Sequence, residues 1–330
     1  MLRPRPVWYW PGVSLFIQTQ TRGGHVSQLQ TMRRRLTLEQ GDLLPVLLLL
    51  PTLMIVVAVM LLPLCYGLYI SLFDYDIGGA LDQSTFIGLG NYAELLRDPT
   101  VWRALQNTVV FSVLATAGDL LIGTVIAVFL QRLRPAIAGP LRALSMMPLL
   151  VSPIIVGLIW RYMYDPTSGF LYWILGLFGV GLKQFPGITQ ASTALLSVVI
   201  AHWWQITPFV ILIVTAGLVS IPCELYEASR IDGAGELRTF FKISLPLLMP
   251  IYMVILVISG VDTIKVFDII YALTQGGPAN ATLSMSIYAY ANAFQMYRMG
   301  YAMAISILTM GVSLCLFGLP FIRFNRRQGR

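Results

Sequence analysis

Six long stretches of mainly apolar residues constrain this chain more than any other feature. A helix needs about 20 such residues to cross the hydrocarbon core of a bilayer. The six stretches are residues 43–70, 109–130, 143–164, 194–219, 247–271 and 303–322. A further apolar run, residues 170–180, is too short to cross and is expected in an outer loop. The sequence therefore predicts an all-α polytopic membrane protein whose six transmembrane helices lie within residues 43–322.

Composition and charge support a membrane location. Hydrophobic residues make up 57% of the chain and charged residues only 11%, whereas soluble domains carry about 25% charged residues. The net charge of +7 is explained by placement rather than by nucleic-acid binding. If the N-terminus is inside, the inner segments hold sixteen of the 22 Lys and Arg residues and the outer loops hold five. The excess of inner positive charge predicts that both termini are cytoplasmic.

The two ends of the chain are predicted to be cytoplasmic tails, residues 1–42 and 323–330. Residues 7–17 form a short apolar run that Pro11 and Gly12 interrupt. No small-residue cleavage site follows closely, so the run does not resemble a signal peptide. We expect natural translation to start at Met32, because Arg33, Arg34 and Arg35 would then anchor the first span.

A polar segment, residues 221–246, separates the fourth and fifth apolar stretches. Pro222 can open a helix that continues to about Asp232, and Gly233 can end it in a left-handed turn. A second short helix is expected over about residues 236–243, with Pro246 starting the return into the membrane. The apolar residues of the first helix recur at helical spacing and are Leu225, Ala228 and Ile231. The composition alone also fits a mixed-charge loop that is simply solvated.

The spacing within this segment resembles the EAA loop of permease subunits of binding-protein-dependent ABC importers. That family's pattern is Glu-Ala-Ala, three residues, Gly, nine residues, and then Ile-x-Leu-Pro. This chain keeps every spacing with Glu227-Ala228-Ser229, Gly233, Ile243 and Leu245-Pro246. The single departure is Ser229 in place of the second alanine, and a serine is small enough to fit a tight helix contact.

Three other stretches resemble the sugar-specific branch of this family, the maltose and glycerol-3-phosphate type. They are residues 86–92, residues 202–209 with the sequence HWWQITPF, and residues 266–278 with the sequence VFDIIYALTQGGP. The resemblance covers most of residues 40–325. It implies a type I importer permease with the MetI-like fold in the inner membrane of a bacterial cell.

The resemblance also implies partners and a set of coupling residues. The expected partners are a second permease subunit in a heterodimer, an ATPase homodimer and an extracytoplasmic solute-binding protein that delivers the sugar. The ATPase-coupling residues that the pattern assigns are Glu227, Ala228, Ser229, Arg230, Asp232, Gly233, Ile243, Leu245 and Pro246.

The chain is not expected to be an enzyme. Its only lysines, Lys183, Lys242 and Lys265, do not follow a glycine, so none of them fits a phosphate-cradling Gly-Lys-Ser or Gly-Lys-Thr loop. We therefore expect no cofactor bound by this chain, with ATP and Mg²⁺ used by the partner subunits. No metal-ligand spacing is present, and no metal site is predicted.

Polar residues inside apolar spans are costly and invite a functional interpretation. Asp262, Lys265 and Asp268 are spaced by three in the fifth stretch, which predicts one helix face in the outer half of the membrane. They form either a structural ion-pair ladder or contacts to a sugar. Asp119, in the second stretch, has no assigned partner or role.

A second group of candidate pathway residues lies outside the fifth stretch. Trp203 and Gln205 suit the faces and hydroxyls of a sugar, or else pack against a neighbouring helix. Asn292, in or near an outer loop, serves either loop packing or substrate contact. His202 is interpreted as a packing residue rather than a metal ligand.

Two other classes of protein remain as alternatives. An ion-coupled secondary carrier fits six spans and a charged triad, but it does not explain the loop spacing. A membrane-embedded enzyme would need reactive groups, and the chain has no His-Glu-x-x-His and no Gly-x-Ser-x-Gly. Disaccharides, oligosaccharides, polyols and glycerol phosphates all fit the sugar-specific branch.

Overall fold

The computed structural model describes residues 43–79, 84–181 and 185–328. The chain divides into two compact units, residues 1–64 and 65–330, and each is described by itself. The predicted tail at residues 1–42 and the predicted start at Met32 lie outside the described residues. Within the described part, five helices are long and apolar enough to cross a membrane, or six if one bent pair counts as a single span.

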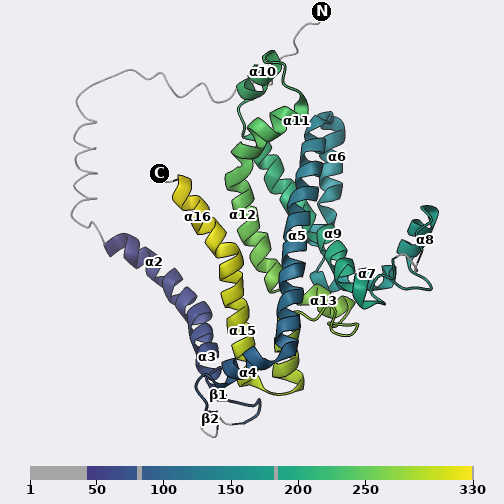
Figure 1. Ribbon diagram of the computed structural model, residues 1–330. Helices are drawn as coiled ribbons and strands as arrows, with labels where there is room; N and C mark the ends of the chain where they lie inside the picture. Colours follow the sequence, from purple (N-terminus) through teal and green to yellow (C-terminus); the bar gives the residue numbers. More distant parts are fainter. Residues whose placement is uncertain (1–42, 80–83, 182–184, 329–330) are drawn as a thin grey trace, which may run out of the picture. The chain divides into compact units, whose positions relative to one another are not determined.

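The first apolar stretch is one helical run of three parts. They are α2 (Leu43–Val56), the π-helical segment η1 (Val57–Leu61) and α3 (Leu62–Ile70). In the second unit, the long helices α5 (Pro99–Arg132) and α9 (Ala191–Val219) pack along each other (Figure 1). Both helices contain their predicted spans, so these two predictions are confirmed. A Cβ at Gly123 of α5 would overlap Val210 of α9, so a glycine there lets the two helices approach closely.

The third predicted span, residues 143–164, is broken rather than continuous. The chain forms α6 (Pro135–Ser145), the 3₁₀ segment η3 (Met147–Leu150) and α7 (Pro153–Met163), with a bend of 98°. Ser152 precedes a proline and takes the extended conformation that such a position favours, with φ −58° and ψ 139°. The prediction of one helix was wrong because hydropathy does not register this change of backbone conformation.

The fifth predicted span, residues 247–271, was placed wrongly at both ends. A continuous helical run joins α11 (Glu236–Thr239), η4 (Phe240–Ser244) and α12 (Leu245–Ile264). The second short helix of the polar segment therefore does not stop near residue 243. After Ile264 the helix ends at Lys265, which has φ −90° and ψ 9°, and α13 (Asp268–Leu273) begins separately and packs on α7.

Three π-helical segments share one relation to proline. The segments η1, η4 and η6 (Leu314–Gly318) each end two residues before a proline, namely Pro63, Pro246 and Pro320. A proline in a helix lacks the N–H that would bond to the carbonyl four residues back, and its ring clashes with that carbonyl. The wider turn of a π-helical segment relieves this clash. These prolines therefore lie within continuous helical runs.

The sixth span is confirmed and extends beyond its predicted end. It comprises α15 (Met299–Ser313), η6 and α16 (Leu319–Gln328), with the apolar part at Met299–Phe324. The predicted basic tail at residues 323–330 is therefore helical as far as Gln328. The helix α15 packs against α14 (Met285–Tyr290), the π-helical segment η5 (Ala291–Gln295) and α4 (Gly90–Arg97).

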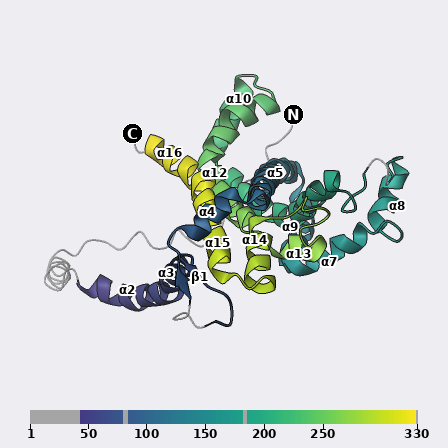
Figure 2. The same ribbon diagram turned by 60° about the horizontal axis from the view of Figure 1, so that its bottom comes forward.

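Short elements cover the two ends of the second unit. One end carries α10 (Cys223–Ile231) and α11, and the opposite end carries α4, α13, α14 and a two-stranded antiparallel ribbon (Figures 1 and 2). The ribbon pairs β1 (Phe73–Asp74) with β2 (Thr85–Phe86). The short apolar run predicted to lie in a loop forms α8 (Phe170–Leu177), which projects away from the bundle in both views.

Candidate functional site

The polar segment between α9 and α12 folds as a helix–turn–helix, as its sequence predicts. The helix α10 ends at Ile231, and Gly233 follows with φ +69°. The Ala234 N–H donates to the Ser229 carbonyl at 2.9 Å and closes the turn. Glycine adopts this left-handed conformation without the clash that a side chain would bring. The turn then leads directly into α11.

The inner face of α10 is held to the second helix by hydroxyl groups. Ser229 is buried, and its Oγ donates to the Tyr226 carbonyl at 2.9 Å and lies 3.2 Å from Thr239 Oγ1. The Tyr226 hydroxyl lies 3.0 Å from Ser244 Oγ. Sequence analysis explained Ser229 only by its small size. The structure adds a function that alanine cannot supply, a polar tether between the two helices.

The outer face of the loop exposes acidic and apolar side chains together. Ile231 is 87% exposed and Leu225 40%. Four of the predicted coupling residues are exposed as well, namely Glu227, Ala228, Arg230 and Asp232. Large apolar side chains at the surface of a polar loop indicate a protein-docking surface. The helical spacing of Leu225, Ala228 and Ile231 thus places an apolar stripe on the surface rather than in the core.

The remaining predicted coupling residues lie where the loop enters α12. Ile243 and Leu245 are half-buried, and Pro246 is exposed two residues after the end of the π-helical segment. An ion pair of 2.6 Å joins Arg132, at the end of α5, to Glu236 of α11. Both side chains are largely exposed, so this pair stabilises the fold by at most about 1 kcal/mol. The ion pair matters because it connects the loop to α5, a span that does not adjoin the loop in sequence.

Trp203 and Gln205 both pack between helices in this structure. Trp203 Nε1 donates to the carbonyls of Leu114 and Ala115 on α5, at 3.2 and 3.1 Å. The indole lies over Gly118, where a Cβ would overlap its ring. Buried Gln205 donates from Nε2 to the Val151 carbonyl at 2.9 Å. That carbonyl lies in the break of the third span, where a freed backbone group needs a partner in the membrane.

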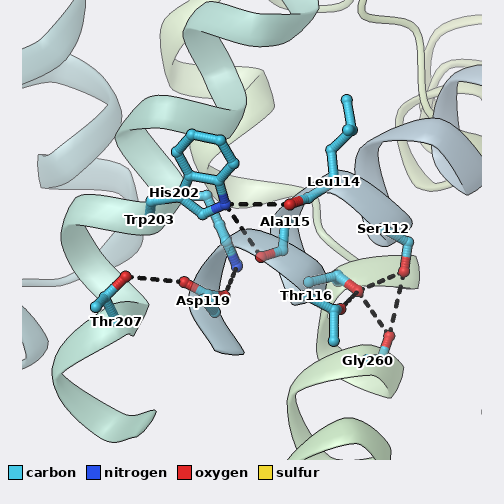
Figure 3. A network of polar contacts seen from close by, with 10 residues as sticks. Ser112, Leu114, Ala115, Thr116, Asp119, His202, Trp203, Thr207 and Gly260 are labelled. Carbon is cyan, nitrogen blue, oxygen red and sulfur yellow. Dashed lines mark hydrogen bonds and ion pairs between the residues drawn. The ribbon is translucent and has the colours of Figure 1, made fainter. Parts of the chain in front are cut away.

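Asp119, which had no assigned partner, lies against His202 across the contact between α5 and α9 (Figure 3). His202 Nε2 is 3.2 Å from Asp119 Oδ2, and Thr207 Oγ1 donates to Oδ1 at 3.1 Å. Asp119 is 0% and His202 6% exposed. Among the described residues, these two facing atoms have no hydrogen-bond partner and meet each other as an ion-pair contact. A buried carboxylate is costly unless it is paired, so this contact satisfies the pair locally.

A second polar contact joins α5 to α12 nearby, again as Figure 3 shows. The hydroxyls of Ser112 and Thr263 are hydrogen-bonded to each other, and Thr116 Oγ1 lies 3.4 Å from Thr263 Oγ1. All three side chains are buried. The His202 ring also meets Phe111 edge to face, with 5.5 Å between ring centroids. His202 therefore packs against Phe111 in addition to its contact with Asp119.

The charged triad of the fifth span is divided between two helices. Lys265 Nζ pairs with Asp262 Oδ1 at 2.8 Å, and both side chains are more than 60% exposed. Asp268 lies at the start of α13, beyond the break, so the predicted single helix face of three charges is wrong. The side chain of buried Asn292 donates from Nδ2 to the Tyr288 carbonyl at 2.9 Å. The backbone carbonyl of Asn292 accepts from the Arg298 N–H.

Lys265 opens onto a groove that sequence reasoning missed. One pocket of about 380 Å³ is lined by Lys265, by the hydroxyl-bearing Ser286, Ser306 and Thr309, and by apolar residues such as Met310. A neighbouring pocket of about 350 Å³ shares Ser286, Ala289 and Ser306 and adds the aromatic residues Phe267, Tyr290 and Phe294. The lining comes from α12, α14 and α15, which are separated in sequence. Hydroxyl groups, one ammonium group and aromatic faces together suit a carbohydrate.

A carboxylate hub at the α14 end was also missed. Asp98 caps α5 through the Thr100 N–H at 2.8 Å and accepts from the hydroxyls of Tyr288 at 2.6 Å and Tyr301 at 3.0 Å. Burial acts to raise the pKa of Asp98, but these hydrogen bonds outweigh it and lower the pKa below its usual range. Arg298 forms two hydrogen bonds with Glu94, at 2.7 and 2.8 Å. Together these contacts tie α4, α5, α14 and α15.

Five or six apolar spans, with an exposed polar helix–turn–helix at one end, define a multi-pass membrane protein. Residues 90–327 match the family described as the binding-protein-dependent transport system inner membrane component. The chain belongs to this family. The match confirms the type of permease that the EAA spacing indicates.

Two curated relatives resemble the chain over most of its length. It is 37% identical to the trehalose/maltose transport system permease protein MalF of Thermococcus litoralis, over 85% of this chain and 92% of that protein. It is 32% identical to the sn-glycerol-3-phosphate transport system permease protein UgpA of Agrobacterium fabrum, over 87% of this chain and 96% of that protein. The resemblance to the sugar-specific branch is thereby confirmed.

A solved structure has the same fold. It is a bacterial alginate ABC transporter in complex with alginate pentasaccharide-bound periplasmic protein, and it matches with a TM-score of 0.73 at 23% identity. The match covers 90% of this chain and 96% of that one. The expected all-α ABC importer permease fold is therefore confirmed.

Proposed function

We propose that this chain is the membrane-spanning subunit of an ATP-driven importer that moves a sugar or polyol into the cytoplasm. The observation that carries the proposal is the exposed face of α10, where Glu227 and Ala228 of the EAA pattern lie beside the apolar Ile231. This face has the chemistry of a docking helix, while Ser229 and Gly233 hold it in place. The relatives named for trehalose, maltose and glycerol 3-phosphate support the substrate class.

The partners in this proposal are an ATPase homodimer, a second permease subunit and an extracytoplasmic solute-binding protein. The chain itself binds no cofactor, and ATP and Mg²⁺ are bound by the ATPase subunits. No lysine of the chain fits a phosphate-binding loop, which supports this division of labour. The alginate transporter, seen in complex with a periplasmic protein, offers an example of such an assembly.

The coupling mechanism follows from one continuous helical run. Glu236–Ile264 extends over 29 residues, from the loop to the break at Lys265. At 1.5 Å per residue its length is about 40 Å. A displacement of α10 and α11 by an ATPase subunit would be transmitted along this run to the break. The groove beside Lys265 lies at that break, so movement of the loop changes the surroundings of the groove.

The proposed orientation places the α10 end in the cytoplasm of a bacterial inner membrane, with both termini inside. The inner excess of Lys and Arg supports it. In this orientation the groove of Lys265, Ser286 and Tyr290 lies in the outer half of the membrane, where a sugar arrives. We assign the first polar contacts of the sugar to Lys265 and Asp262, with Asp268 beyond the break. Trp203, Gln205 and Asn292 then position helices rather than touch the sugar.

Uptake by proteoliposomes tests the proposal. The vesicles would contain this chain with its genomic partner subunits, and a panel of labelled sugars would be offered with the binding protein. We expect uptake that requires ATP and falls at least tenfold in Glu227→Ala, while Glu224→Ala, another exposed acid on α10, stays near wild type. Uptake that follows an ion gradient without the ATPase would overturn the proposal in favour of a secondary carrier.

A further inference from the structure

Two adjoining cavities at the α10 end have opposite chemical character. The first, of about 310 Å³, lies between the end of α5 and the coupling loop. The second, of about 700 Å³, runs along α5 beside η4 and α12. Val128, Arg132 and Phe240 line both cavities. The two cavities are therefore parts of one amphipathic site, with Arg132 at the junction.

The first cavity is rich in hydrogen-bond donors and positive charge. Arg132 and Arg230 line it, together with Gln131, Thr239 and Ser244. Glu236 is the one acidic side chain in its lining, and it pairs with Arg132 at 2.6 Å. The lining side chains therefore carry a net charge of +1, from two arginines and one glutamate. Guanidinium groups bind phosphate oxygens through strong, charge-assisted hydrogen bonds.

The second cavity is a groove of apolar side chains. Leu120, Leu121, Val125, Phe129 and Phe241 form most of its wall. Its hydroxyl groups Thr124 and Tyr252 lie 3.0 Å apart and hydrogen-bond to each other. The groove extends along α5 from Ala117 to Arg132, which is about 22 Å at 1.5 Å per residue. One leaflet of a bilayer has a hydrocarbon depth of about 15 Å.

We propose that this pair of cavities binds an anionic phospholipid, with its phosphate at Arg132 and Arg230 and one acyl chain in the groove. An apolar groove longer than the hydrocarbon depth of one leaflet, which ends at Arg132 and adjoins the cavity that holds Arg230, matches both parts of such a lipid. The bound phosphate shares Arg132 with Glu236, and the lipid thereby bridges α5 and the coupling loop. Its occupancy then adjusts how firmly the loop is held to the span. The binding part of this inference is independent of the proposed sugar transport.

Native mass spectrometry of the purified, delipidated complex tests the binding. Phosphatidylglycerol and phosphatidylcholine with identical acyl chains would be titrated in parallel. We expect preferential retention of phosphatidylglycerol. Arg132→Gln should weaken that retention by about tenfold, because a charge-assisted contact is lost. Arg238→Gln, which removes an exposed arginine outside both cavities, should leave it unchanged.

The Arg132–Glu236 ion pair provides a test of opposite sign. Glu236→Gln should strengthen phosphatidylglycerol binding severalfold, because it releases Arg132 from a competing carboxylate. A purely structural role for the ion pair predicts that Arg132→Gln and Glu236→Gln shift binding in the same direction, which would overturn the proposal. Val125→Trp places a large side chain in the groove and leaves the two arginines unchanged. It should weaken the binding of phosphatidylglycerol.

Three other results would also overturn the proposal. The first is equal retention of the two lipids. The second is displacement of phosphatidylglycerol by glycerol phosphate at matched concentration, which would reveal a simple anion site. The third is a complex that retains no lipid and loses its second permease subunit in Val125→Trp, which would assign the groove to that subunit. None of these depends on whether the complex imports a sugar.

Discussion

The coupling loop and the polar contacts inside the membrane are built in different ways. In the loop, interacting residues are close in sequence, as with Ser229 and Thr239, which are ten residues apart. In the membrane, Asp119 and His202 come from different spans, 83 positions apart. The loop presents Glu227 and Ala228 of the EAA pattern outward, whereas the membrane pair is buried. The fold of the loop can therefore be predicted from residues that are close in sequence. The contact between Asp119 and His202 depends on how the helices pack and cannot be predicted in this way.

The largest effect should come from breaking the buried pair. Asp119→Ala leaves His202 without its partner, and removing one partner of a buried pair costs about 3–5 kcal/mol. We expect a marked loss of thermal stability for the chain in lipid nanodiscs. The double variant Asp119→Leu with His202→Leu should recover much of the loss, since an apolar pair leaves no polar atom unpaired. Independent, additive losses would show that the two residues are not coupled.

The second prediction concerns the carboxylate hub at the α14 end. Asp98→Asn removes charged acceptors from Tyr288 and Tyr301 and should cost about 2–3 kcal/mol. Because the folded-state pKa is lowered, the ionised form stabilises the fold above about pH 4. That stabilisation should disappear as the pH falls through the folded-state value. Melting curves between pH 3 and 7 should show less acid sensitivity in Asp98→Asn than in wild type.

The turn of the coupling loop should show a smaller cost in stability. Gly233→Val places a branched side chain at φ +69°, which strains the backbone by about 1–3 kcal/mol. The strain is relieved by moving α10, so ATP-driven uptake should fall at least tenfold while the spans stay folded. Gly235→Ala is the matched control, because its φ is −68° and a Cβ there meets nothing within 4 Å. Equal losses in both variants would refute a special role for the turn.

Ser229→Ala, which restores the second alanine of the family pattern, should have a milder effect. It removes the hydrogen bonds to the Tyr226 carbonyl and Thr239 while keeping a small side chain. We expect a loss of about 1 kcal/mol and somewhat faster hydrogen exchange in α10. Thr239→Val should reproduce this change, and the double variant should be no worse than either single one. Fully additive exchange rates would contradict a shared tether.

The smallest stability effect should follow changes beside the groove. Lys265→Met breaks an exposed ion pair with Asp262, which contributes at most about 1 kcal/mol. If the groove takes the sugar, the KM for uptake should nevertheless rise severalfold with little change in melting temperature. Arg161→Met, a change at the end of α7 away from both pockets, serves as the control. An unchanged KM would remove Lys265 from the pathway.

The breaks in the spans mark a limit of what hydropathy reveals. Pro246 lies in a continuous helix because a π-helical segment precedes it, whereas the chain around Ser152 turns by 98°. In the second case Gln205, from another helix, supplies a donor to the Val151 carbonyl. A proline breaks a membrane helix only where the freed backbone groups find partners. Such partners come from distant parts of the sequence.

The sequence by itself determined the membrane class, the number of apolar spans and the helix–turn–helix of the coupling loop. These features depend on the length of apolar runs and on spacings within one or two helical turns, which consecutive residues define. Only the tertiary structure decided the partner of Asp119, the separation of Asp268 from Lys265, and the groove shared by α12, α14 and α15. Each of these depends on which helix faces which, and that choice arises from packing among segments far apart in the chain.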